Sequence, residues 1–119
     1  MARVAALIPD LLFGSKVAGM LQRAGHEVQL VNSGAEGWEL PDGVDVLLVD
    51  LVGEGPGGIA LLERLRGDGR VAGVRTLAVY SHVDADTRRQ AVDAGFDLVV
   101  PRSRMVREGA ELIGKLGEA

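Results

Sequence analysis

Four polar residues stand where apolar stretches of the sequence end, and their side chains are of types that could form a reactive crevice. Asp50 closes the run VDVLLVD, Ser81 closes RTLAVYS, Arg102 directly follows FDLVVP, and Asp10 comes shortly after RVAALI. A carboxylate buried there without a partner would lose on the order of several kcal/mol of hydration free energy. Asp50 therefore either meets charged partners or caps the turn that follows it, as strand-ending acids often do. The nearby acid, hydroxyl and guanidinium favour charged partners.

Five apolar runs of strand length must position these side chains. The runs alternate with segments of helical period, and this alternation predicts βαβ units and a parallel sheet. The runs at 3–8, 44–50 and 75–81 are apolar on both alternating faces, which is typical of strands covered by helices on both sides. The run at 26–31 alternates polar with apolar residues and is predicted at an edge, and the remaining run spans 96–101.

The segments between the runs carry helix start and stop signals. Gly25, Pro41 and Gly95 are typical stops, and Asp84 and Ser103 are typical N-caps. The expected helices span, in chain order, 12–24, 35–40, 58–66, 85–94 and the segment after Ser103. The last helix should bury one apolar stripe, formed by Val106, Ala110, Ile113 and Leu116.

These elements predict an α/β fold with a doubly wound, flavodoxin-like sheet of five parallel strands in the order 2-1-3-4-5 and helices on both faces. The whole chain, 1–119, is expected to be a single domain. In this strand order the first and third strands flank the point where the winding reverses. Asp10, Asp50, Ser81 and Arg102 should then face one crevice at the carboxyl ends of the strands.

Composition excludes several classes of function. The net charge of -4 lacks the positive field that a direct nucleic-acid partner would require. With no cysteine, the chain has no disulfide, no thiolate zinc site and no cysteine nucleophile. The apolar stretch after Arg3 ends at Pro9, too early for a signal or membrane segment, so we expect a cytoplasmic protein without membrane contact.

Over essentially its whole length the chain resembles the receiver domains of two-component response regulators. The segments LLVD, AVYS and VVPRS carry the resemblance, and Gly58 matches the glycine that follows the loop after the acceptor. The resemblance implies that Asp50 accepts a phosphoryl group from a histidine kinase, with the help of Mg²⁺. It also implies that Ser81, and Arg102 in place of the family's Lys, contact the phosphoryl oxygens.

The metal site implied by the resemblance is incomplete in this sequence. The acidic pair of the family aligns with Ile8 and Pro9, and neither side chain can bind a metal. Asp10 could supply one carboxylate beside Asp50, and Glu54 either adds a ligand or points to solvent. Mg²⁺ prefers near-octahedral oxygen coordination, so we expect its binding to be weak or absent.

Other positions near the predicted crevice also differ from the family. Val99 replaces an aromatic switch residue, and His82 is bulkier than the small residue usual beside Ser81. Arg102 keeps the positive charge of the family's Lys but has a planar fork of different shape. His82 and His26 have no metal-ligand spacing and are predicted to be at the surface or half-buried. Asp50 is therefore expected to be an impaired phosphoacceptor.

Taken with the resemblance, these patterns predict a stand-alone signalling or regulatory domain that acts through protein contacts. It is not expected to be an enzyme beyond self-phosphorylation at Asp50. Its predicted partner is a histidine kinase or another signalling protein, and a homodimer is also allowed. The alternative is a domain of the same fold that binds a small anion or nucleotide without phosphorylation. The stretch IPDLLFGSK, at 8–16, lacks a glycine-rich phosphate-binding pattern, which weakens this alternative.

Overall fold

The computed structural model describes residues 1–31, 38–52 and 57–118, and its strands form one parallel sheet. The strands are β1 (Arg3–Leu7), β2 (Glu27–Val31), β3 (Val46–Asp50), β4 (Arg75–Tyr80) and β5 (Leu98–Pro101). They pair in the order β2-β1-β3-β4-β5, and every pair is parallel. The predicted fold class and strand order are confirmed, including the placement of the second strand at an edge.

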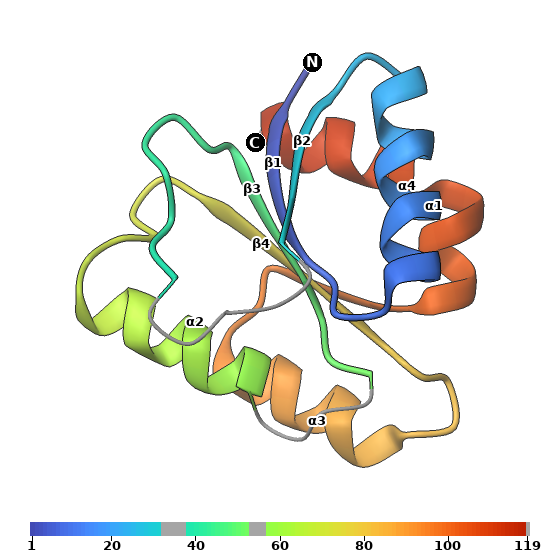
Figure 1. Cartoon of the computed structure of the whole chain (residues 1–119). Coiled ribbons are helices and arrows are strands. Elements are labelled where there is room, and N and C mark those ends of the chain that lie inside the picture. Colours follow the sequence, from blue (N-terminus) through green and yellow to red (C-terminus); the bar gives the residue numbers. More distant parts are fainter. Residues whose placement is uncertain (32–37, 53–56, 119) are drawn as a thin grey trace.

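The helices form the two outer layers of the molecule (Figure 1). They are α1 (Leu11–Arg23), α2 (Gly57–Gly67), α3 (Ala85–Ala94) and α4 (Arg102–Glu118). Helices α1 and α4 cover one face of the sheet, and α2 and α3 cover the other. Within the described ranges, no helix is both long and apolar enough to cross a membrane.

Strand β3 shows why both layers are needed. Every one of its residues is buried. Val46 and Leu48 pack toward α1 and α4, whereas Leu47 and Val49 pack toward α2 and α3. Burial of each such side chain contributes roughly 1.5–3 kcal/mol, so the strand is held firmly from both sides. Asp50 is the last residue of this strand, and its position is therefore well defined.

Capping residues fix the ends of the helices as the sequence indicates. The Asp84 carboxylate accepts a hydrogen bond of 3.0 Å from the backbone N–H of Thr87 at the start of α3. Gly95 ends that helix in the left-handed conformation with φ of 93°. At α1 the cap is Asp10, which accepts a hydrogen bond of 3.0 Å from the Phe13 N–H. This capping role of Asp10 was not predicted.

The helix expected over 35–40 is wrong in the described residues. Residues 38–40 are not helical, while 32–37 lie outside the described residues. The carbonyl of Trp38 instead accepts a hydrogen bond of 2.6 Å from Arg64 of α2, which draws this segment onto that helix.

The last helix also differs from its predicted form. It begins at Arg102, so Ser103 is not its cap. Pro101 ends β5, and its fixed φ suits direct entry into a helix. The buried residues of α4 are Met105, Gly109, Leu112 and Ile113, of which Ile113 belongs to the predicted stripe. The buried face is thus centred about one residue earlier than the predicted stripe, whose Val106, Ala110 and Leu116 are half-buried.

Candidate functional site

Asp50 lies at the carboxyl edge of the sheet, and each oxygen of its carboxylate accepts one hydrogen bond. The residue is 6% exposed and its side chain 0%. Its Oδ1 accepts a hydrogen bond of 3.0 Å from the Val52 backbone N–H, and its Oδ2 accepts one of 2.5 Å from Nη2 of Arg102. The first bond is a local turn contact and the second is a buried ion pair. Both possibilities raised by the sequence, the turn cap and the charged partner, are thus realised together.

Arg102 contacts both predicted acids. As the first residue of α4 it follows β5 directly, which brings its side chain back over the edge of the sheet. Its Nη2 donates to Asp50, and its Nη1 donates to Oδ2 of Asp10 over 3.3 Å. One guanidinium therefore bridges two carboxylates that lie forty positions apart in the sequence. A planar fork with two terminal nitrogens is suited to this bridge.

Phe13 completes the surroundings of the guanidinium. Its ring centroid lies 4.2 Å from Cζ of Arg102, within the range of a cation–π contact. The Arg102 side chain is only 27% exposed. Its Nε is buried and has no hydrogen-bond partner among the residues that the structure describes. The two acids and the ring thus account for the polar and aromatic contacts of this side chain within those residues.

Ser81 is placed at the same edge by the register of the sheet. Asp50 pairs with Val79 of β4, and Ser81 lies two residues beyond Val79, directly after that strand. Ser81 is half-buried, and its carbonyl accepts a hydrogen bond of 2.8 Å from the Asp84 N–H. Of the four predicted site residues, hydrogen bonds join Asp10, Asp50 and Arg102, and strand register brings Ser81 to the same edge.

The two carboxyl groups respond differently to this environment. Burial raises the pKa of Asp50 above its ordinary value of 3.8, and the hydrogen bonds from Arg102 and Val52 offset that effect only in part. The Phe13 N–H lowers the pKa of Asp10, and Arg102 adds to this lowering. The buried carboxyl is thus the more difficult of the two to ionise, although both lie against the same cation.

Among the described residues at this edge, the two carboxylates that could bind Mg²⁺ already have other partners. Asp10 and Asp50 each use one oxygen for a backbone N–H and the other for Arg102. Ile8, at one position of the family's acidic pair, is fully buried among apolar residues. No group of three or more acidic, His or Cys side chains gathers anywhere in 1–31, 38–52 or 57–118. Glu54 lies outside the described residues.

The other positions noted from the sequence show no contact with Asp50 or Arg102 among the described residues. His82 is exposed in the turn after β4, and Val99 is half-buried in β5. Gly58 lies in the first turn of α2 against Val49 and Leu51, where a Cβ would come within 2.6 Å and 2.5 Å of their side chains. This close approach gives Gly58 a packing role.

Sequence reasoning missed Phe13. The spacing pointed to this residue, because Phe13 stands three residues after Asp10. At that spacing an N-cap acid accepts a hydrogen bond from the backbone N–H. Aromatic residues form only 3% of the chain, so one beside a predicted acid is informative. The stacking on Arg102 could not be read from the sequence, because it depends on where a long side chain from α4 returns.

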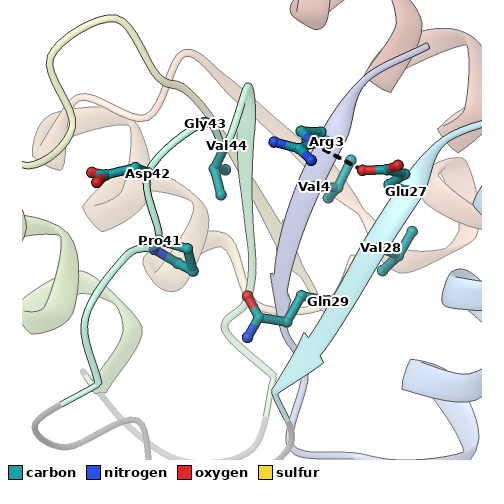
Figure 2. A pocket seen from close by; sticks show the side chains of 9 residues that line it. All are labelled: Arg3, Val4, Glu27, Val28, Gln29, Pro41, Asp42, Gly43 and Val44. Atoms are coloured by element: carbon teal, nitrogen blue, oxygen red, sulfur yellow. Dashed lines mark hydrogen bonds and ion pairs between the residues drawn. The ribbon is translucent and has the colours of Figure 1, made fainter.

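A separate hollow lies beside the first residues of β1 and β2, and Figure 2 shows the side chains that line it. It measures about 310 Å³ and opens between these strands and the segment 41–44. Its one guanidinium, from Arg3, pairs with Glu27 over 2.9 Å (Figure 2). Because Asp42 also lines the hollow, it does not resemble an anion-binding site.

Comparisons with known proteins support the fold. No family model matches the sequence, and no curated protein matches it. Solved structures do match over nearly the whole chain. A response regulator receiver domain from Francisella superposes with a TM-score of 0.83 at 16% identity, covering 99% of this chain and 98% of that one. A response regulator from Thermotoga maritima gives 0.77 at 18% identity, covering 100% and 99%.

A third match bears a different name. It is a putative pilus assembly-related protein from Burkholderia pseudomallei, with a TM-score of 0.76 at 19% identity and coverage of 99% and 90%. At such identities the likeness concerns architecture. The chain has the flavodoxin-like fold of response regulator receiver domains.

Proposed function

We propose that this chain is a receiver-like signalling domain that acts through protein contacts, with Asp50 as an impaired phosphoacceptor. The observation that carries the proposal is the state of the Asp50 carboxylate, whose side chain is 0% exposed and whose two oxygens are both engaged. The expected partner is a histidine kinase or another signalling protein, and a homodimer is compatible with the fold. We place the domain in the cytoplasm.

Phosphorylation of Asp50 would need an oxygen that is free to attack. In the transfer, a carboxylate oxygen forms a bond to phosphorus while the bond between phosphorus and the donor's leaving oxygen breaks. Each oxygen of Asp50 accepts one hydrogen bond and keeps a second lone pair, but the side chain is 0% exposed, so the ion pair with Arg102 must open before a phosphodonor can reach it. A divalent ion normally neutralises charge in such a transfer, whereas the carboxylates of Asp10 and Asp50 are both paired with Arg102. These contacts support slow phosphorylation or none.

The same contacts do not favour a small anion or nucleotide at this edge. Arg102 is the natural anion ligand there, but it already faces two carboxylates. An incoming anion would meet their negative charge and would have to displace at least one of them. Signalling through protein contacts requires no such exchange.

Incubation with acetyl phosphate tests the proposal. The purified chain is mixed with the donor in the presence and absence of Mg²⁺, and its intact mass is followed beside Asp50→Asn. We expect little or no phosphoryl adduct, with no dependence on Mg²⁺. Rapid, complete formation of an adduct that needs both Asp50 and Mg²⁺ would overturn the impaired phosphoacceptor. Immobilised wild type and Asp50→Asn should also retain the same signalling proteins, and a domain that retains none would contradict the interaction role.

A further inference from the structure

The cation of this site is supplied by the chain itself. Arg102 carries one positive charge between the carboxylates of Asp10 and Asp50, with nitrogen to oxygen distances of 3.3 Å and 2.5 Å. Asp10 follows β1, Asp50 ends β3 and Arg102 follows β5, so the bridge joins three separate strand ends. The receiver fold would place a divalent cation against carboxylates at this same edge.

We propose that the Arg102 guanidinium, held in place by Phe13, substitutes for the divalent cation and excludes metal ions from Asp10 and Asp50. Each terminal nitrogen of the fork takes one carboxylate oxygen, and the backbone N–H groups of Phe13 and Val52 take the other oxygens. A metal ion at these carboxylates would have to displace the guanidinium or lie beside it, where two positive charges repel each other. This inference does not depend on the signalling role proposed above.

Phe13 is the positioning residue in this arrangement. Its ring stacks at 4.2 Å on the guanidinium, while Nε of Arg102 has no hydrogen-bond partner in the described part of the chain. The orientation of the guanidinium plane therefore depends on the two acids and on the ring. A side chain of similar bulk without an aromatic face would let Arg102 move away from the carboxylates.

Arg102→Gln tests the substitution directly, because it should strengthen metal binding at Asp10 and Asp50 above that of the wild type. The probe is Mn²⁺, and the readout is the electron paramagnetic resonance signal of the free ion during titration. We expect Arg102→Gln to bind Mn²⁺ roughly tenfold more tightly than the wild type, or better, since one neighbouring positive charge has been removed. Arg102→Lys keeps the charge but not the fork, and its affinity for Mn²⁺ should lie between those of the wild type and Arg102→Gln.

Variants of Phe13 test its positioning role in the same titration. Phe13→Leu should tighten Mn²⁺ binding by about threefold, part of the gain that Arg102→Gln gives, because the loosened guanidinium yields more readily to the ion. Phe13→Tyr keeps the aromatic face and should behave as the wild type. If Phe13 had only a packing role, Phe13→Leu and Phe13→Tyr would not differ in their affinity for Mn²⁺.

Matched controls separate this site from other acidic groups. Arg104→Gln removes a neighbouring arginine of α4 that pairs with Glu108 over 3.4 Å, and it should leave Mn²⁺ binding unchanged. Asp50→Asn added to Arg102→Gln should abolish the gain in Mn²⁺ affinity. Circular dichroism confirms the fold of each variant, and Phe13→Leu and Arg102→Lys provide the comparison if Arg102→Gln is unfolded. Tight Mn²⁺ binding by the wild type, or equal weak binding by all folded variants, overturns the inference.

Discussion

Asp10 and Asp50 share one guanidinium, yet their pKa values move in opposite directions. Asp50 is buried, and the loss of hydration raises its pKa more than its hydrogen bonds lower it. Asp10 is exposed and caps a helix, so the Phe13 N–H lowers its pKa. The electrostatics of the site are therefore set by burial at one acid and by backbone hydrogen bonding at the other.

This difference predicts opposite pH dependences for two isosteric variants. Because the folded pKa of Asp50 lies above the ordinary value of 3.8, folding stability falls as pH rises through the interval between the two values. Asp50→Asn should thus gain stability relative to the wild type as pH rises from about 3 to 7. The gain should be about 1.4 kcal/mol for each pH unit that separates the folded from the unfolded pKa of Asp50. Urea unfolding at several pH values measures the change.

Asp10→Asn provides the matched control, since asparagine also caps helices. The folded pKa of Asp10 is lowered, so its contribution to stability is present above pH 3.8 and is lost as pH falls through the folded pKa. This variant should lose stability relative to the wild type as pH rises. A wild type that gains stability over Asp50→Asn with rising pH would show that Arg102 outweighs burial at Asp50.

At the residue scale, the position of the candidate site residues at one edge of the sheet was predictable, and their contacts were not. The end of an apolar strand locates Asp50, and the ends of neighbouring parallel strands locate Asp10 and Arg102. The sequence does not indicate that Arg102 reaches both acids, because side-chain rotamers depend on packing around the finished site. The proposed replacement of a metal by this guanidinium is argued from the contacts of the folded chain and not from the sequence.

At the scale of elements, period-two and period-3.6 patterns predicted the strands and most helices. Strands such as β3 are buried on both faces, so their apolar runs stand out clearly. The helix expected over 35–40 was wrong at 38–40 because tertiary contacts, such as the bond from Arg64 to the Trp38 carbonyl, outweigh a weak local preference. Burial of Met105 in α4 likewise depends on where the helix begins.

The junction of β3 and α2 gives a prediction about packing. A Cβ on Gly58 would lie 2.5 Å from Cδ2 of Leu51 and 2.6 Å from Cγ1 of Val49, both of which are buried. Alanine usually favours a helix over glycine by about 1 kcal/mol. Here overpacking should prevail, and Gly58→Ala should lower the free energy of unfolding by roughly 1–3 kcal/mol.

Gly67→Ala is the control for this prediction. Gly67 ends the same helix, and apart from its chain neighbours and the backbone of its own helix no heavy atom of the described residues lies within 4 Å of the position that its Cβ would take. Alanine there should be neutral or stabilising in urea unfolding. If both substitutions changed the free energy of unfolding equally, α2 and β3 would be able to accommodate the added Cβ at residue 58 without loss of stability.

At the scale of the whole molecule, His26 ties together segments that are far apart in the sequence. Its Nδ1 accepts a hydrogen bond of 3.0 Å from the Ala2 N–H, and its Nε2 lies 3.3 Å from the carbonyl of Ala110 in α4. A carbonyl can only accept, so Nε2 carries the proton in this arrangement. The half-buried ring thus links the start of β1, the start of β2 and the helix that carries Arg102.

Replacement of His26 by Ala should therefore weaken the fold as a whole. The change leaves the Ala2 N–H without its acceptor at a half-buried site and removes a second contact from the Ala110 carbonyl, which should cost roughly 1–3 kcal/mol in the free energy of unfolding. Urea unfolding at neutral pH measures the loss. His82→Ala is the matched control, because His82 is exposed in a turn and its removal should change stability by less than about 0.5 kcal/mol. If the two histidine variants were equally stable, the ring would not link these segments in solution, and α4 would depend on its apolar contacts alone to hold Arg102 over the site.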